Sequence, residues 1–173
     1  MKARHHKMKG TAMLRLLLLS ALFFTPAAIA QETPPAAEVD ETRIVPKGWE
    51  GVYNQFHYAP AVRAGNTLYL SGIVATLTGD ENEQNPADVE AAFDRAFQSI
   101  GAVLKEAGAD WSDVVEMTTF HTELIPQIQP FTASKDKFIK APYPAWTAID
   151  VDRLYPERGL VEIKVIAYVG EER

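Results

Sequence analysis

The sequence predicts a single α+β domain, with helices covering one face of a mixed β-sheet. Two observations support this class. Strand-like runs recur in the C-terminal half, most clearly in Leu160–Val169, where every second residue from Val161 onward is apolar. Between Val89 and Ala107, apolar residues recur every three or four positions, which predicts a long amphipathic helix. A wide apolar stripe on a helix needs a sheet to cover it, so the two patterns belong to one packed domain.

The domain is expected to open with a β-hairpin. Gly65-Asn66 separates two strand-like runs, and both residues tolerate the positive φ angles that tight hairpin turns need. The following run, Thr67–Thr76, is apolar on both faces, so we expect it to be buried on both sides. Ser71 and Gly72 interrupt this strand, and a glycine inside a strand often marks the close approach of a ligand or another backbone.

The long helix has clear signals at both ends. Asn85 is a favoured N-cap residue, Pro86 suits the first helical turn, and Gly108 suits the C-terminal end. Three strands and a second, shorter helix complete the expected domain. In chain order they are the strand Val114–His121, the helix Pro130–Lys140, and the strands Ala145–Val151 and Leu160–Val169.

The first thirty of the 173 residues differ in kind from the rest. Five basic residues and no acidic ones accompany the apolar run Leu16–Ile29, which ends in a small-residue site at Ala30. This pattern predicts a secretory signal peptide over residues 1–30 and a periplasmic or secreted protein. The apolar run is short of the about 20 residues that a membrane-spanning helix needs, which disfavours a retained anchor.

The remaining chain divides into a tether and one domain. Residues 31–43 are rich in Pro, Ala and Glu, which predicts a flexible tether, and residues 44–173 form the domain. Removing residues 1–30 removes five of the 17 basic residues and none of the 23 acidic ones, leaving a net charge of −11. Such a charge disfavours partners such as nucleic acid or an anionic membrane and leaves a small-molecule ligand open. With no cysteine, the chain has no disulfide and no thiol nucleophile.

Metal and cofactor chemistry have little support in the sequence. Only His57 and His121 remain beyond residue 30, and no cysteine or Asp/His cluster has the spacing of metal ligands. The chain also lacks a glycine-rich phosphate loop and a nucleophile elbow. We therefore expect neither a metal nor a cofactor.

Glu162 is the strongest catalytic candidate that the residue pattern offers. Its strand is otherwise largely apolar, so the carboxylate is either a general base that orients water or the partner of Lys164 in a weak ion pair. Both interpretations stay open on the sequence. We also expect Trp146, in the neighbouring strand-like run, to face the same pocket as Glu162.

The order of these motifs resembles the Rid family (reactive intermediate deaminases, also called YjgF). A tyrosine, a Gly-Asn turn, an apolar strand and a Ser-Gly step follow one another from Tyr58 to Gly72. The segments 144–148 and 161–167 resemble the two closing strands of that family, and the resemblance covers residues 44–170. It implies a chorismate-mutase-like fold with two helices on one face of a mixed sheet, assembled as a homotrimer with ligand sites in the clefts between subunits.

The resemblance also implies a chemistry. In the best-known members an arginine in the cleft grips the carboxylate of a 2-imino acid, and a glutamate helps water to attack the imine carbon, which yields a 2-keto acid and ammonia. Glu162 matches the glutamate, whereas Tyr58, Ser71 and Gly72 match ligand-binding positions. Trp146 occupies the arginine position and offers one N–H and a flat apolar face in place of a bidentate cation.

Two functions are therefore expected as alternatives. The first is a hydrolase or deaminase-like enzyme acting on a substrate other than simple 2-imino acids, with Trp146 stacking on the ligand. The second is a non-catalytic module that binds a metabolite or a protein through the same cleft. The enzyme requires Glu162, whereas binding by stacking does not.

Overall fold

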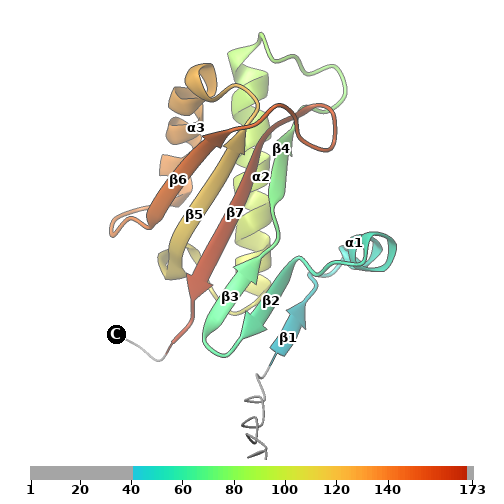
Figure 1. The fold of residues 1–173 in the computed structure, drawn as a ribbon, viewed down its shortest axis with the longest axis vertical. Helices are drawn as coiled ribbons and strands as arrows, with labels where there is room; N and C mark the ends of the chain where they lie inside the picture. The colour runs from blue at the N-terminus through green and yellow to red at the C-terminus, as the bar shows by residue number, and fades with distance from the viewer. Residues whose placement is uncertain (1–40, 171–173) are drawn as a thin grey trace, which may run out of the picture. The chain divides into compact units, whose positions relative to one another are not determined.

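The computed structural model describes residues 41–170, which form a seven-stranded mixed sheet with the two longer helices packed on one face (Figure 1). The strands follow the order β1-β2-β3-β7-β5-β6, and β4 also pairs with β7. Only β5 and β6 are parallel; the other pairs are antiparallel. The strands are β1 Glu41–Ile44, β2 Ala61–Ala64, β3 Thr67–Leu70, β4 Ile73–Thr76, β5 Val114–His121, β6 Ala145–Asp150 and β7 Gly159–Tyr168. The helices are α1 Glu50–Phe56, α2 Pro86–Glu106 and α3 Leu124–Phe138, with a 3₁₀ turn at Trp111–Asp113.

The predicted α+β class with a mixed sheet is confirmed by this topology. The predicted signal peptide, residues 1–30, and most of the predicted tether lie outside the described residues. Residues 41–43, the end of the predicted tether, instead pair with β2 as part of β1. Helix α1 is an addition to the two predicted helices. Its seven residues include no buried side chain, so no apolar stripe marks it in the sequence.

Helix α2 forms where its sequence signals predict. The Asn85 side chain accepts a hydrogen bond from the backbone N–H of Ala87, and Gly108 beyond the last turn has a positive φ of 74°. Helix α3 begins at Leu124, before the predicted start, so Pro130 lies inside the helix. The two helices pack on the sheet through a cluster of aromatic rings. Phe131 of α3 lies 5.4 Å from both Phe93 and Phe97 of α2, centroid to centroid.

The predicted strand Thr67–Thr76 is broken in the middle. Its halves, β3 and β4, pair with different parts of β7, and the chain bends between them at Ser71-Gly72. The bend therefore lies opposite the middle of β7, between the residues of β7 that pair with β3 and those that pair with β4. We call this break the kink.

The two faces of the sheet differ in their side chains. Alternate residues of β7 are buried toward the helices, as the sequence predicts, and include Val161, Ile163 and Val165. The opposite face, which we call the open face, carries large apolar side chains that are exposed in a single chain. Among them are Tyr69, Ile149 and Tyr168. None of the helices within residues 41–170 is long and apolar enough to cross a membrane.

Candidate functional site

The kink brings Gly72 against Glu162. A Cβ atom at Gly72 would lie 1.8 Å from Oε1 of Glu162, so any side chain larger than that of glycine would displace this carboxylate from where it lies. Within residues 41–170 the Glu162 carboxylate has no hydrogen-bond or ion-pair partner, and it forms no ion pair with Lys164. The interpretation of Glu162 as the partner of Lys164 in a weak ion pair is therefore wrong. A half-buried carboxylate without a partner remains available to a ligand or a water molecule.

Ser71 fixes the other side of the kink. Its Oγ donates to the carbonyl of Ala59 over 2.8 Å, and its backbone N–H donates to the carbonyl of Pro60 over 2.9 Å. These bonds hold the segment that follows Tyr58 beside the kink. Because the hydroxyl proton is committed to Ala59, the Ser71 oxygen can only accept a hydrogen bond from a ligand.

Two cavities meet at Ser71 and Gly72. The larger, about 550 Å³, lies on the open face of the sheet and contains Glu162; we call it the kink cavity. Its lining comprises Val62, Tyr69, Leu70, Ser71, Gly72, Phe120, Val151, Arg153, Leu154, Glu162 and Lys164. The smaller, about 300 Å³, contains Tyr58 together with Trp49, Phe56 and Tyr155; we call it the tyrosine pocket. The structure therefore gathers Tyr58, Ser71, Gly72 and Glu162 around one bend in the chain.

Trp146 lies elsewhere, and the hypothesis that it shares a pocket with Glu162 is wrong for a single chain. In the register of β5 with its neighbours, Met117 pairs with Trp146, whereas Phe120 pairs with Glu162. Positions 117 and 120 point to opposite faces of a strand, because the side-chain period is two residues. The indole therefore faces α3, where its ring centroid lies 5.8 Å from that of Phe131.

A polar network explains the orientation of the indole. Trp146 Nε1–H donates to Thr119 Oγ1 over 3.0 Å, and Thr119 Oγ1 lies 2.9 Å from Nε2 of the buried His121. His121 Nδ1 lies 3.2 Å from Oε1 of Gln127 in α3. Burial lowers the pKa of His121, more than its contact with Gln127 raises it. We call these four residues the indole network; it joins β5, β6 and α3.

Lys135 of α3 places a cation beside the indole, a contact that no local pattern in the sequence indicates. Its Nζ lies 5.6 Å from the ring centroid of Trp146 and 5.7 Å from that of Tyr143. The Lys135 ammonium also forms an ion pair with Asp136. Arg63, the basic residue close to Tyr58 in the sequence, donates to the carbonyl of Gly65 and lines neither cavity at the kink.

The described residues contain no cluster of three or more His, Asp or Glu side chains arranged to hold a metal ion. His57 is exposed at the end of α1, and His121 is buried in the indole network. Neither lines the kink cavity.

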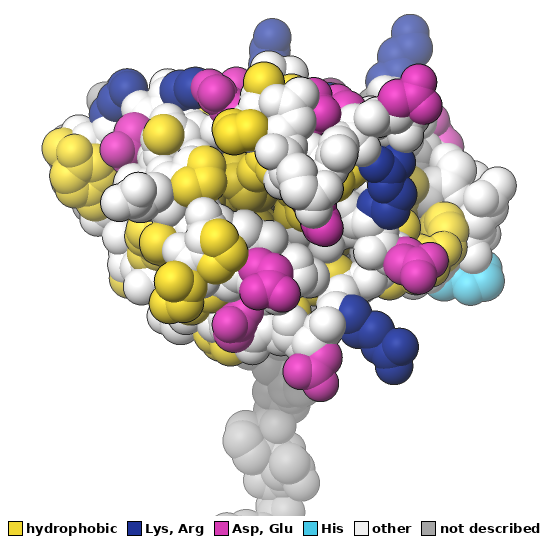
Figure 2. Space-filling model, turned by 90° about the horizontal axis from the view of Figure 1, so that it is seen from above, with side chains coloured by type: hydrophobic (Ala, Val, Ile, Leu, Met, Phe, Trp, Pro, Cys, Tyr) yellow, Lys and Arg dark blue, Asp and Glu magenta, His cyan; other side chains and the backbone are white. Residues whose placement is uncertain are grey.

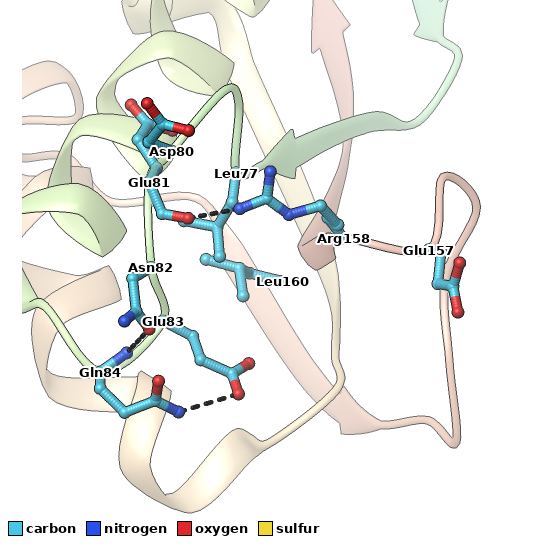
Figure 3. Close-up of a pocket in the computed structure, with 9 residues that line it drawn as sticks. All are labelled: Leu77, Asp80, Glu81, Asn82, Glu83, Gln84, Glu157, Arg158 and Leu160. Carbon is cyan, nitrogen blue, oxygen red and sulfur yellow. Dashed lines mark hydrogen bonds between the residues drawn. The ribbon is translucent and has the colours of Figure 1, made fainter.

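A third cavity, of about 480 Å³, is polar and lies at the loop 77–85 (Figure 3). Arg158 crosses it and donates to the backbone carbonyls of Gly79 and Glu81. Glu81 in turn accepts two hydrogen bonds from Arg95 of α2, over 2.8 and 2.7 Å. The Arg95 contact lowers the pKa of Glu81 to about 2. Arg158, Arg95 and Glu81 thus use their hydrogen-bonding groups to hold the loop 77–85 in place, and we assign this cavity a structural role.

Comparison with known proteins places this geometry in a family. Residues 52–169 match the family model described as endoribonuclease L-PSP. The chain belongs to this family. It is the Rid (YjgF) family that the order of motifs predicted, and its members have the fold described above.

Individual relatives support the same assignment. The chain is 34% identical over 137 residues to the RutC family protein YjgH of Escherichia coli, covering 78% of this chain and 99% of the relative. A solved structure of protein YJGH matches with a TM-score of 0.63 and 32% identity, over 78% of this chain and all of that one. The chain is also 33% identical over 115 residues to a protein of Dermatophagoides farinae named 2-iminobutanoate/2-iminopropanoate deaminase, covering 65% of this chain and 85% of the relative.

Proposed function

We propose that this Rid-family protein hydrolyses a C–N bond of a small substrate in the kink cavity, with Glu162 as the general base. The observation that carries the proposal is the Glu162 carboxylate, which lies unpaired against Gly72 in a cavity lined by apolar and basic side chains. A carboxylate with an uncommitted oxygen can take a proton from water. Relatives named as imine deaminases support this reaction class.

The chemistry requires only water and the substrate. For a substrate with a C=N bond, Glu162 accepts a proton from water as the water oxygen bonds to the imine carbon. That proton passes to the nitrogen, which gives a carbinolamine. Glu162 then takes the proton of the carbinolamine hydroxyl and delivers it to the nitrogen, so that the C–N bond breaks, ammonia leaves and the carbonyl forms. The oxygen of Ser71 accepts a hydrogen bond from the substrate, and the Tyr58 hydroxyl contacts it from the adjoining pocket.

The substrate is larger than 2-iminopropanoate. Trp146 stands at the position where the family resemblance expects an arginine, and its indole faces α3 rather than the kink cavity. A cavity of about 550 Å³ would leave most of its walls untouched by so small a molecule. We therefore expect a substrate whose body fills the apolar part of the cavity.

The kink cavity opens on the face of the sheet that carries exposed Tyr69, Ile149 and Tyr168. In a homotrimer of the kind that the family resemblance implies, this face would be covered by other copies and the cavity would become a cleft between subunits. A cleft would exclude water other than the attacking molecule. Trimer assembly is thus part of the proposed function.

The name endoribonuclease in the family description does not extend to this proposal. The chain beyond residue 30 has a net charge of −11, which opposes contact with RNA phosphates. Figure 2 shows one end of the molecule, where basic side chains are scattered among acidic and apolar ones and form no continuous patch. This charge distribution favours a small-molecule ligand over a polyanion such as RNA.

The test is ammonia release from imines generated in situ, with aliphatic and aromatic side chains compared. The wild type should accelerate release from the aromatic imine more than from 2-iminopropanoate. Glu162→Gln should lower that rate about 100-fold or more, because general-base catalysis contributes at least that much. Glu106→Gln, an exposed carboxylate at the end of α2, is the control and should not change the rate. Hydrolysis that survives Glu162→Gln would contradict the proposal, and binding without hydrolysis would favour the non-catalytic module.

Export to the periplasm or beyond completes the proposal. Cleavage after Ala30 is supported by the basic residues that precede the apolar run Leu16–Ile29, by that run itself, and by the small residues at its end. N-terminal sequencing of the protein from its producing cell should begin at Gln31. A mature protein that retains Leu16–Ile29 would contradict export by cleavage.

A further inference from the structure

We propose that Arg153 and Lys164 bind the anionic end of the substrate in the kink cavity, so that the site accepts a small carboxylate with an aromatic body. This inference rests on the proposed function and names the chemical class of its substrate. It also assigns to two residues the charge that Trp146 does not supply.

The first observation is that both cations are uncommitted. Within residues 41–170 neither Arg153 nor Lys164 makes a side-chain hydrogen bond or an ion pair, although both line the cavity that holds the Glu162 carboxylate. Some basic residues elsewhere are engaged, Arg95 with Glu81 and Lys137 with Glu90 and Asp94. Within the described chain Lys105 is as unpaired as Arg153 and Lys164, but it does not line the cavity that contains the Glu162 carboxylate. Two exposed cations left beside one free carboxylate indicate a site that is completed by a ligand.

The second observation is how these charges are placed. Lys164 follows Glu162 by two residues in β7 and therefore shares its face of the sheet. Arg153 comes from the segment after β6, so the two cations approach the cavity from different elements. A guanidinium offers two parallel donors to a carboxylate, and an ammonium adds a second charge. This combination selects a carboxylate over a neutral group.

The third observation is the apolar wall. Tyr69 of β3 and Phe120 of β5 line the same cavity, with Val62, Leu70, Val151 and Leu154 completing the apolar part. An aromatic ring buries more apolar surface against this wall than a methyl group does, and binding strengthens with the apolar surface that is buried. The volume of about 550 Å³ is shared by the two cations, the apolar wall and the Glu162 carboxylate, so an anionic end, an aromatic body and the reacting carbon each have a group of matching chemistry in one cavity.

Direct binding tests the inference without requiring turnover. The probe is benzoylformate, a stable aromatic 2-keto acid, and its neutral counterpart is methyl benzoylformate. Isothermal titration calorimetry at low ionic strength compares the two on the protein purified as its cell processes it. The acid should bind the wild type at least about tenfold more tightly than the ester, as expected for charge-assisted bonds.

Matched variants locate the charge. The double variant Arg153→Gln/Lys164→Gln should lose that preference and bind the acid about tenfold or more weakly, while its affinity for the ester stays unchanged. The control Arg63→Gln/Lys105→Gln removes the same charge from residues outside the cavity and should keep the preference. Equal affinity for acid and ester in the wild type, no binding of either, or an equal loss in both double variants would overturn the assignment.

Glu162→Gln separates this inference from the proposed function. It should still bind benzoylformate, since the carboxylate contacts water and the reacting carbon rather than the anionic end. If binding depends on Arg153 and Lys164 but no imine is hydrolysed, the cation assignment stands and the hydrolase falls. If hydrolysis depends on Glu162 while the acid and the ester bind alike, the hydrolase stands and the cation assignment falls.

Discussion

At the scale of single residues, Thr119 determines where the indole of Trp146 points. Its hydroxyl accepts the indole N–H and lies within hydrogen-bond distance of His121, and all three groups sit between β5, β6 and α3. Thr119→Val keeps the shape of the side chain and leaves the partly buried indole N–H and a nitrogen of the buried His121 imidazole without partners. We expect a loss of about 1–3 kcal/mol of unfolding free energy, measured by urea denaturation.

Thr118→Val is the matched control for that experiment. Thr118 lies next in the strand on the opposite face, and its hydroxyl makes only a long exposed contact of 3.3 Å to Glu116. Its replacement should change stability by less than about 0.5 kcal/mol. Equal effects at positions 118 and 119 would show that the indole network contributes nothing to stability.

At the scale of elements, the kink between β3 and β4 links backbone shape to catalysis. Gly72→Ala would place a methyl group on the Glu162 side chain, which can swing away at little cost. We expect a stability change below about 1 kcal/mol, but a hydrolysis rate about 100-fold lower, since a misplacement of 1 Å costs that much. Gly159→Ala is the contrast, because its methyl group would lie 2.7 Å from Val74 Cγ1 and 3.0 Å from the Pro156 carbonyl. It should cost about 1–3 kcal/mol of stability through overpacking.

The loop 77–85 gives a pH-dependent prediction at the same scale. The Arg95 guanidinium holds the pKa of Glu81 at about 2 in the folded protein, below its ordinary 4.5. A group with a lowered folded-state pKa stabilises the fold above its unfolded pKa and loses that effect as the pH falls toward its folded pKa. The wild type should therefore melt at a higher temperature than Glu81→Gln above pH 4.5, and the difference should shrink between pH 4.5 and 2. A difference that stays constant over this range would contradict the role of the carboxylate charge.

At the scale of the whole molecule, the open face of the sheet predicts self-assembly. Tyr69, Ile149 and Tyr168 are each more than 40% exposed on it, which is unusual for one side of a sheet left in water. Light scattering should find a trimer at micromolar concentration. Ile149→Asp places a charge on this face and should shift the protein toward monomers. Ile125→Asp, at the start of α3 and 82% exposed, should not. A wild-type monomer would contradict both the assembly and the cleft.

The sequence alone determined those features that depend on local order along the chain. The Gly65 turn, the Asn85 cap, the strand Val114–His121 and the alternation of β7 follow from neighbouring residues and were all predicted. The family assignment also rested on the order of such local motifs. Helix α1 was missed because it buries nothing, and helix α3 was predicted to begin too late because Pro130 looks like a first-turn residue.

Only the tertiary structure decided which side chains meet. Trp146 and Glu162 lie in strands that are both apolar, and nothing local tells which face of one corresponds to which face of the other. That relation is set by how each strand pairs with β5, where Met117 and Phe120 fall on opposite faces. The same pairing brought Arg153, a loop residue with no motif around it, into the cavity with Glu162. Register between strands is a contact between distant parts of the chain, and it is fixed only when the sheet assembles.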